Sequence, residues 1–139
     1  MKLHVVKQGD TSIEGYKKIE FLNGNFLGLD DVSNNSSEEI FANDVLDAIP
    51  NEFIQQSVAA LVGKLRVNGR ITVGGTELRL FVKSVLNQGI PEDQAMSIIK
   101  TNQSMLNFNK LCELMKSMGL EVETTTINGI HCEVKCVRK

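Results

Sequence analysis

The sequence predicts an α/β fold with a mostly parallel sheet, one antiparallel strand supplied by a C-terminal hairpin, and helices on both faces of the sheet. Three observations support this prediction. Short β-branched runs alternate with one-sided helical stripes through the middle of the chain. Beyond Gly119 the hydrophobic period falls to two on either side of Asn128 and Gly129, which is a strong hairpin signal. The 139 residues suffice for a single domain, 1–139, with its own core.

Short apolar runs predict strands in the first third of the chain. They lie at 2–6, 17–22, 26–29 and 40–42. The segment between the first two is punctuated by glycine and too short for a long helix. The third run ends at Asp30 and Asp31, which also suit a turn, and the fourth stops at Asn43 and Asp44. Asp44 would serve equally well as a helix cap.

Helical spacing predicts the remaining elements. Apolar residues recur at three- and four-residue intervals from Ile54 to Leu65, and a β-branched strand over 70–73 follows. Further helices are expected at about 78–86, 91–100 and 107–118. Pro91 suits a first helical turn and Asn107 suits a cap, so both mark helix starts.

The composition narrows the possible partners. The apolar fraction is 42%, the charged fraction is 23% and the net charge is −2. This balance lacks the basic excess that contacts to phosphate usually require, so no nucleic-acid partner is expected. No apolar run approaches the roughly 18–20 residues of a membrane span, and the N-terminus lacks a secretory pattern. We therefore expect a cytoplasmic protein without a membrane partner.

The cysteines and histidines predict no metal site. Cys112, Cys132 and Cys136 form no CxxC pair, and we expect them to be small buried hydrophobes. His4 lies within an apolar run and is expected in the core. His131 and Cys132 are adjacent on a predicted strand, so their side chains face opposite sides and do not converge on one ion.

Several stretches resemble the class I methyltransferases that use S-adenosylmethionine, in particular a compact branch similar to methyltransferase type 11. EGYKKIE at 14–20 corresponds to the Gly-Tyr that leads into the family's second strand and its carboxylate. SSEEIFANDVLDAIP at 36–50 is similar to the family's sFDEIYASHVLEHIP. LRVNG at 65–69 stands where the family has LKPGG, and LNFNKLCELMKSMGLEVE at 106–123 resembles its late helix and strand. The resemblance covers essentially the whole chain and implies a Rossmann-like methyltransferase sheet.

The resemblance also implies S-adenosylmethionine as the cofactor and gives the matched positions their roles. These positions are Lys7, Gln8, Gly9, Glu20, Asp30, Asp31, Asn43 and Asp44. The first three would form the loop under the methionine part, and the glutamate would bind the ribose. Asp30 or Asp31 would lie near the adenine, and the last two residues would face the methyl group. No side chain is assigned as the catalytic base.

Departures from the family's pattern leave two functions open. The family's GCG loop is replaced by Val6–Gln8 before Gly9, so one glycine remains, and its LEH is replaced by residues 46–48, LDA. The first function is a methyltransferase acting on an unidentified acceptor. The second is a non-catalytic binding or interaction module with the same fold.

Residues 88–107 are the one candidate for a cover over the acceptor site. Exposed apolar residues in this segment, such as Met96, Ile98 and Ile99, would also suit a contact between two copies of the chain. A lid and a homodimer contact are both compatible with the sequence.

Overall fold

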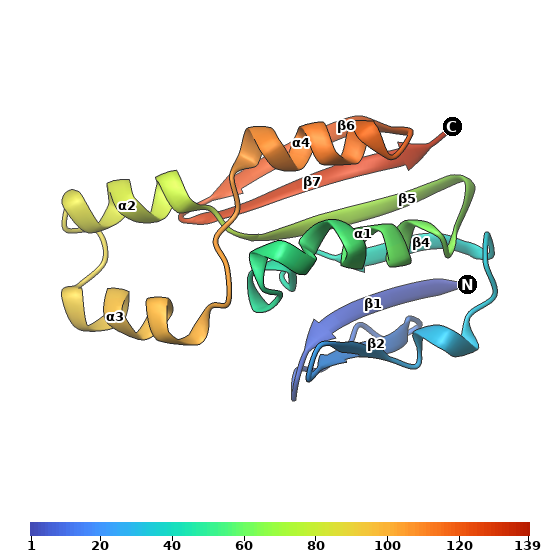
Figure 1. Cartoon of the computed structure of the whole chain (residues 1–139), viewed down its shortest axis with the longest axis horizontal. Coiled ribbons are helices and arrows are strands. Elements are labelled where there is room, and N and C mark those ends of the chain that lie inside the picture. The colour runs from blue at the N-terminus through green and yellow to red at the C-terminus, as the bar shows by residue number, and fades with distance from the viewer.

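The computed structural model describes all 139 residues and contains one seven-stranded sheet in the order β3-β2-β1-β4-β5-β7-β6 (Figure 1). The strands are β1 (Lys2–Lys7), β2 (Lys17–Leu22), β3 (Asn25–Leu27), β4 (Ser37–Ala42), β5 (Leu65–Thr76), β6 (Leu120–Asn128) and β7 (His131–Arg138). The α-helices are α1 (Ile54–Val62), α2 (Leu78–Leu86), α3 (Glu92–Thr101) and α4 (Phe108–Ser117). Short 3-10 helices are η1 (Leu29–Asp31), η2 (Leu46–Ala48) and η3 (Asn51–Phe53). None of the helices has both the length and the apolar character needed to cross a membrane.

The strand directions are more mixed than the sequence predicted. β1, β2, β4 and β5 are parallel, and β7 is antiparallel to both of its neighbours, β5 and β6, as expected of a terminal hairpin. The expectation of one antiparallel strand is nevertheless wrong, because β3 is also antiparallel to β2. Asn23 and Gly24 adopt φ values of 50° and 81°, and this pair of positive values turns the chain straight back in a tight hairpin.

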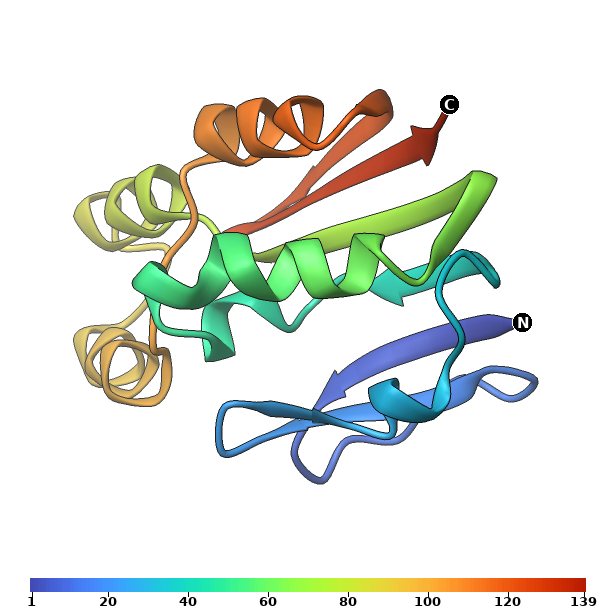
Figure 2. The same ribbon diagram turned by 45° about the vertical axis from the view of Figure 1, so that its right-hand side comes forward.

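The prediction of helices on both faces of the sheet is also wrong. Figures 1 and 2 show α1 and α4 on the same side of the sheet. A helix on the other face would have to come from the connections in the N-terminal half. Residues 8–16 join β1 to β2 without a helix, and a two-residue turn joins β2 to β3. Both connections are shorter than the dozen or so residues that a helical crossover usually takes.

The covered face of the sheet holds the hydrophobic core. Alternate residues of the central strands point to this face and pack against α1 and α4. The largest fully buried members are Leu3, Ile19, Ile40, Leu46, Ile49, Leu61, Leu65, Ile71 and Met115. Cys132 and Cys136 belong to the same core, where burial raises the pKa of each thiol to about 11. Both thiols therefore stay protonated and act as small apolar side chains, as expected.

The opposite face is polar and only partly covered. The loop 8–16 lies over its β1 end, where the backbone N–H of Ile13 donates to Nδ1 of His4 at 3.0 Å. The His4 ring packs against Phe41 at 5.5 Å between centroids, so this histidine lies on the uncovered face and not in the main core. Charged and hydroxyl side chains occupy the rest of this face, around a shallow hollow of about 180 Å³.

α2 and α3 form a helical hairpin that projects from the end of the sheet (Figure 1, left). Glu77, which is 5% exposed, caps α2 by accepting hydrogen bonds from the backbone N–H groups of Arg79 and Leu80. Its other carboxylate oxygen accepts from the backbone N–H of Phe108 at 3.3 Å. One buried carboxylate therefore fixes the starts of both α2 and α4, and so the base of the hairpin.

Gly74 occupies the tightest point of the sheet. A Cβ built at this position would lie 2.4 Å from the carbonyl oxygen of Cys132 and 2.5 Å from that of Asn43. Both oxygens belong to the backbone of neighbouring segments, so neither can rotate away as a side chain would. At Gly63, by contrast, φ is −61° and the nearest backbone oxygen would lie 3.5 Å from a new Cβ.

The two glycines provide a matched test of the packing. Gly74→Ala should lower the free energy of unfolding by at least about 2 kcal/mol, because the strands must separate to admit the methyl group. Gly63→Ala should leave it unchanged or raise it by about 0.5–1 kcal/mol, because alanine narrows the unfolded ensemble at a compatible φ. Urea denaturation measures both. Similar small effects at the two positions would contradict the close approach at Gly74.

Candidate functional site

The carboxyl ends of β1 and β4 lie side by side where the order of the strands reverses. The next strand after β1 is its neighbour β2, whereas the next strand after β4 lies on the other side, at β5. The connections that leave the two strands therefore diverge and open a crevice, which is where open α/β sheets bind ligands. Lys7 ends β1 at this crevice, and Asn43 and Asp44 directly follow β4.

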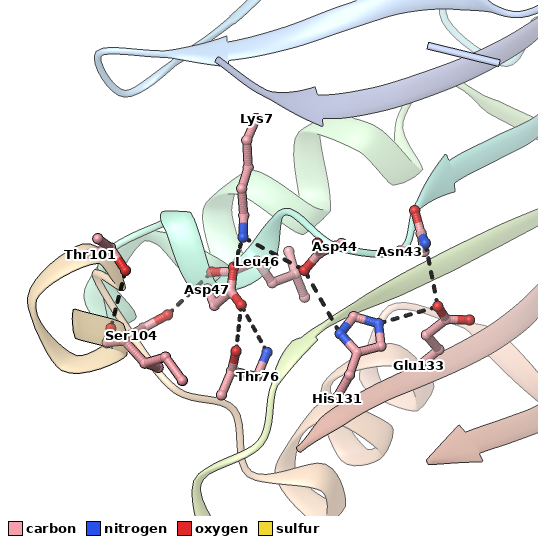
Figure 3. Close-up of polar contacts among 11 residues, drawn as sticks. Lys7, Asn43, Asp44, Leu46, Asp47, Thr76, Thr101, Ser104, His131 and Glu133 are labelled. Carbon is pink, nitrogen blue, oxygen red and sulfur yellow. Dashed lines mark hydrogen bonds and ion pairs between the residues drawn. The ribbon is translucent and has the colours of Figure 1, made fainter. Parts of the chain in front are cut away.

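Lys7 reaches across the crevice to two aspartates (Figure 3). Its Nζ lies 2.9 Å from Oδ1 of Asp47 and 3.6 Å from Oδ1 of Asp44. The side chain of Asp47, in η2, is 2% exposed, whereas that of Asp44 is 56% exposed. The lysine therefore fastens the end of β1 to the chain that follows β4.

The end of β5 also binds Asp47. Oδ2 of Asp47 accepts hydrogen bonds from the backbone N–H of Thr76 at 2.9 Å and from its hydroxyl at 2.8 Å. Gly75 permits this approach, because a Cβ there would lie 3.0 Å from the backbone nitrogen of Asp47. Burial alone would raise the pKa of Asp47, but Lys7 and the Thr76 donors outweigh burial and hold that pKa below its ordinary value. Asp47 is therefore firmly ionised.

The other two charges of the crevice are shifted as well. Burial disfavours the ammonium of Lys7, but the hydrogen bond and charge of Asp47, with those of Asp44, raise its pKa. Burial also raises the pKa of Asp44, and the negative charge of Asp47 adds to that effect against the attraction of Lys7. The crevice thus contains one cation, one firmly ionised carboxylate and one carboxylate that is easier to protonate.

A second set of polar contacts continues from Asp44 to β7 (Figure 3). Nδ1 of His131 lies 3.7 Å from Oδ1 of Asp44, and Nε2 lies 3.2 Å from Oε1 of Glu133. Asn43 donates to the same Glu133 oxygen at 3.3 Å. Because β7 is antiparallel, its first residue lies opposite Thr76 at the carboxyl end of β5. The imidazole therefore stands between two carboxylates at the rim of the crevice, with its side chain 26% exposed.

Two hollows open along this edge of the sheet. The smaller, of about 260 Å³, is lined by His4, Val5, Val6, Asp10, Thr11, Asn43 and Asp44. The larger, of about 510 Å³, is lined by Phe21, Asn23, Gly24, Ala48, Ile49, Pro50, Phe53, Gln56, Ser57 and Gln103. Phe21 pairs with Lys7 in the β1–β2 register and Ala48 follows Asp47, so this hollow adjoins the ion pair. Its volume lies within the roughly 300–1,000 Å³ of small-molecule sites.

Gly9 and Glu20 come together on the uncovered side of the sheet. The turn after β1 gives Gly9 a φ of 83°, and its backbone N–H donates to Oε2 of Glu20 at 3.3 Å. Nζ of Lys18 lies 3.4 Å from the same oxygen. Glu20 faces away from the core because Ile19, its neighbour in β2, is a core residue. Gln8 is exposed in the same turn.

Asp30 and Asp31 lie apart from the polar contacts of the crevice. Both are in η1, and β3 runs antiparallel to β2, so the chain has already turned back toward the amino end of β2 when it reaches them. Of the residues predicted from the resemblance, the structure brings together Lys7, Asn43 and Asp44. The role of each predicted residue in cofactor binding stays a prediction.

Sequence reasoning did not place Asp47, Thr76, His131 and Glu133 at the site. One signal for Asp47 was available, since it is the single charge among the apolar residues between Asp44 and Pro50. The signal for His131 was the hairpin itself, because the second arm of a terminal antiparallel hairpin starts at the edge where the parallel strands end. Both signals depend on knowing which strands are neighbours.

No family model and no curated protein matches this chain. Its structure is similar to that of an O-methyltransferase family protein from Burkholderia thailandensis, with a TM-score of 0.61 and 12% identity over 88% of this chain and 36% of that one. It is similar to a SAM-dependent methyltransferase from Archaeoglobus fulgidus, with a TM-score of 0.60 and 8% identity over 98% of this chain and 86% of that one. It is also similar to magnesium protoporphyrin IX methyltransferase from Synechocystis PCC 6803 with bound SAH, with a TM-score of 0.59 and 12% identity over 89% of this chain and 52% of that one.

These similarities establish the fold. The chain has the α/β architecture of SAM-dependent methyltransferases, at identities of 8–12%. It spans 36% of the length of the Burkholderia protein and 52% of the Synechocystis enzyme. Because one fold can carry many activities, the activity of this chain must be argued from its own crevice.

Lys7→Met should show how strongly the crevice depends on its ion pair. Removal of the ammonium leaves the Asp47 carboxylate buried and unpaired, so the free energy of unfolding at pH 7 should fall by about 2 kcal/mol, less than for a fully buried pair because Lys7 is one-third exposed. Lys18→Met, which removes an exposed partner of Glu20, should cost no more than about 0.5 kcal/mol. The double variant Lys7→Met/Asp47→Asn should recover part of the loss.

The pH dependence of the same variants checks the cause. The pKa of Asp47 is lowered in the folded protein, so its ionised form stabilises the fold above its ordinary pKa of 3.8, and this contribution is lost as pH falls through the folded pKa. In Lys7→Met the penalty comes from the unpaired charge, so it should shrink as pH is lowered toward 4 and Asp47 takes up a proton. A penalty that stays constant between pH 7 and pH 4 would mean that lost packing, and not the charge, is responsible.

Proposed function

We propose that the protein binds S-adenosylmethionine at the carboxyl edge of its sheet and transfers the methyl group to a small-molecule acceptor. The observation that carries this proposal is the crevice at the switch point of a methyltransferase-type sheet, where Lys7, Asp44 and Asp47 adjoin a hollow of about 510 Å³. The bound cofactor would supply an electrophilic methyl group. The chain must supply recognition of both ends of the cofactor and a place for the acceptor's proton.

The lining of the larger hollow suits an adenosine group. Phe21, Ile49 and Pro50 offer apolar surface for a flat ring, and the amides of Asn23 and Gln103 can donate to and accept from its polar edge. The methionine part carries an ammonium and a carboxylate, and the adjoining crevice offers charges of both signs. Lys7 would hold the carboxylate and Asp44 the ammonium. The residues present therefore fit the cofactor, although Lys7 replaces a glycine of the related motif.

His131 is the side chain best placed to accept a proton. Methyl transfer to oxygen or nitrogen usually requires removal of a proton from the acceptor, and imidazole is the commonest group for this task. His131 lies at the rim of the crevice, and its two ring nitrogens face Asp44 and Glu133. Glu133 can hold Nε2 and stabilise the imidazolium that forms, whereas Nδ1, which makes no hydrogen bond and lies 3.7 Å from Asp44, is the nitrogen that would take the proton. The exposed rim would then be the acceptor side of the site.

The non-catalytic alternative also has a specific observation in its favour. The ammonium of Lys7 is already neutralised by Asp47, and the Gly9 N–H is already bonded to Glu20, the carboxylate expected to bind the ribose. A cofactor would have to compete with both contacts. A chain that kept these contacts would retain the fold as a binding or interaction module without methyl transfer.

Titration with S-adenosylhomocysteine separates the two functions without knowledge of the acceptor. We expect saturable heat for one site in calorimetry, and a stabilisation of about 2.7 kcal/mol at 100 times the dissociation constant. If millimolar ligand gives no heat and no shift in melting temperature, the cofactor proposal is ruled out and the binding module remains. Glu20→Ala tests the ribose assignment separately. Glu20 lies on the uncovered side of the sheet and does not line the larger hollow, so unchanged affinity would leave the adenosine group in that hollow and remove Glu20 from the site.

A matched pair of variants in α1 tests the position of the adenosine group. Ser57→Phe places a ring in the larger hollow and should weaken S-adenosylhomocysteine binding at least about tenfold, because the apolar walls are no longer free. Ala59→Phe adds the same side chain on the exposed side of the helix and should leave affinity within about twofold. Equal affinities for the two variants would place the ligand elsewhere.

His131→Gln tests the proton acceptor. Glutamine keeps a polar side chain of similar reach but cannot take a proton at neutral pH, so the rate of methyl transfer should fall about 10²- to 10⁴-fold. The affinity for S-adenosylhomocysteine should stay within about twofold, because His131 lies on the acceptor side. Release of S-adenosylhomocysteine in the presence of a panel of small hydroxyl- and amine-bearing acceptors provides the measurement. An unchanged rate would exclude His131 as the base.

A further inference from the structure

The α2–α3 hairpin presents an apolar stripe that no other part of the chain covers. Its members are 45% to 77% exposed, and they recur at helical spacing on one side of each helix. They are Leu78, Val82 and Leu86 on α2, with Met96 and Ile99 on α3. The hairpin itself is held firmly at its base by Glu77, so the stripe is displayed on a fixed support.

A groove of about 350 Å³ runs between the two helices and joins their exposed residues into one surface. Seven of its eight lining residues are hydrophobic, and Glu92 is the exception. Phe81 and Ala95 are both 5% exposed, so they close the groove from within the hairpin. Two helices with an open groove between them form half of a four-helix arrangement, in which a second helix pair would fill the groove.

The area of the stripe is suited to a contact between two copies of the chain. The exposed parts of its five large side chains amount to on the order of 500 Å², near the upper end of what monomers display. When the stripe packs against the stripe of a second copy, the two would together bury about 1,000 Å² without any flanking residue. Specific interfaces begin at about this area.

Four charges at the ends of the hairpin are arranged so that it complements itself, whereas Lys83, in the last turn of α2, does not follow this arrangement. Arg79 and Lys100 lie at its base, whereas Glu92 and Asp93 lie at its tip. None of the four takes part in an ion pair within the chain. When two hairpins lie antiparallel, the base of each meets the tip of the other, and opposite charges face each other at both ends. A parallel arrangement would place like charges together.

We propose that this protein forms a two-fold symmetric homodimer in which the α2–α3 hairpins pack antiparallel, base to tip. The apolar stripe of one copy covers the groove of the other, and because the symmetry sets α3 against its own equivalent, Lys100 of each copy faces Glu92 and Asp93 of the other. The sequence left residues 88–107 as either a lid or a dimer contact. In this arrangement the segment contributes α3 to the dimer interface. The argument for the dimer does not rest on the cofactor proposal, because the interface includes none of the crevice residues.

The first experiment measures the oligomeric state of the full chain by sedimentation equilibrium between 1 and 100 µM, a range that brackets about micromolar affinity. We expect a monomer–dimer equilibrium with the dimer predominant at the upper end. Leu86→Arg places a charge on the most exposed residue of the stripe and should lower the association constant at least about 30-fold. Ile127→Arg, at a 58% exposed position on β6, should not change it. A wild-type chain that stays monomeric throughout the range, or a Leu86→Arg dimer of unchanged affinity, overturns the proposal.

The second experiment tests the antiparallel orientation by charge exchange. Lys100→Glu alone should weaken the dimer, because two carboxylates would then face each other at both ends of the α3 contact, and Glu92→Arg alone should weaken it for the converse reason. An equimolar mixture of the two variants should restore association, since both facing pairs become opposite in charge in the mixed dimer. Thermal melting of each variant confirms that it is folded. A mixture that associates no better than its components overturns the base-to-tip arrangement.

Discussion

Asp47, through its carboxylate and its backbone carbonyl, joins three parts of the chain that are distant in sequence. Lys7 reaches the carboxylate from β1, and Thr76 donates to the carboxylate from β5. The backbone carbonyl of Asp47 accepts from the N–H groups of Gln103 and Ser104 at 2.9 and 3.2 Å. A buried charge persists only when it is paired and hydrogen-bonded, so an aspartate at position 47 requires its carboxylate contacts to Lys7 and Thr76. The shape of the crevice follows from them, because Lys7 must cross it to reach its partner.

Elements with local signals were predictable from the sequence. α3 and α4 begin where Pro91 and Asn107 predicted, and the terminal hairpin turns after Asn128. The direction of β3 and the absence of helices on one face were not anticipated, since both depend on how the chain returns between strands. The turn at Asn23 and Gly24 reverses the chain within two residues, and this leaves no length for the helix that a parallel β3 would have required.

The site was predictable only in the part that lies at strand ends. Lys7, Asn43 and Asp44 follow apolar runs that had to be adjacent parallel strands, so their convergence could be expected. The direction of Glu20 required the register of β2, which turns that side chain to the uncovered face. Asp47 lies beyond the strand end, in η2, and only the pairing of β5 with β7 brings His131 to the same edge. These residues meet at the site because their strands are neighbours in the sheet, and not because of their spacing along the chain.

The proposed interface and the proposed ligand site are connected by a short stretch of backbone. α3 ends at Thr101, and Gln103 both bonds to Asp47 through its N–H and lines the larger hollow with its side chain. α3 contributes Met96 and Ile99 to the exposed stripe on the other side of this connection. A partner that fixes α3 would therefore also fix one wall of the hollow. Because the same wall is hydrogen-bonded to the buried carboxylate, dimer formation would favour one arrangement of the crevice and reduce the entropy lost when a ligand binds.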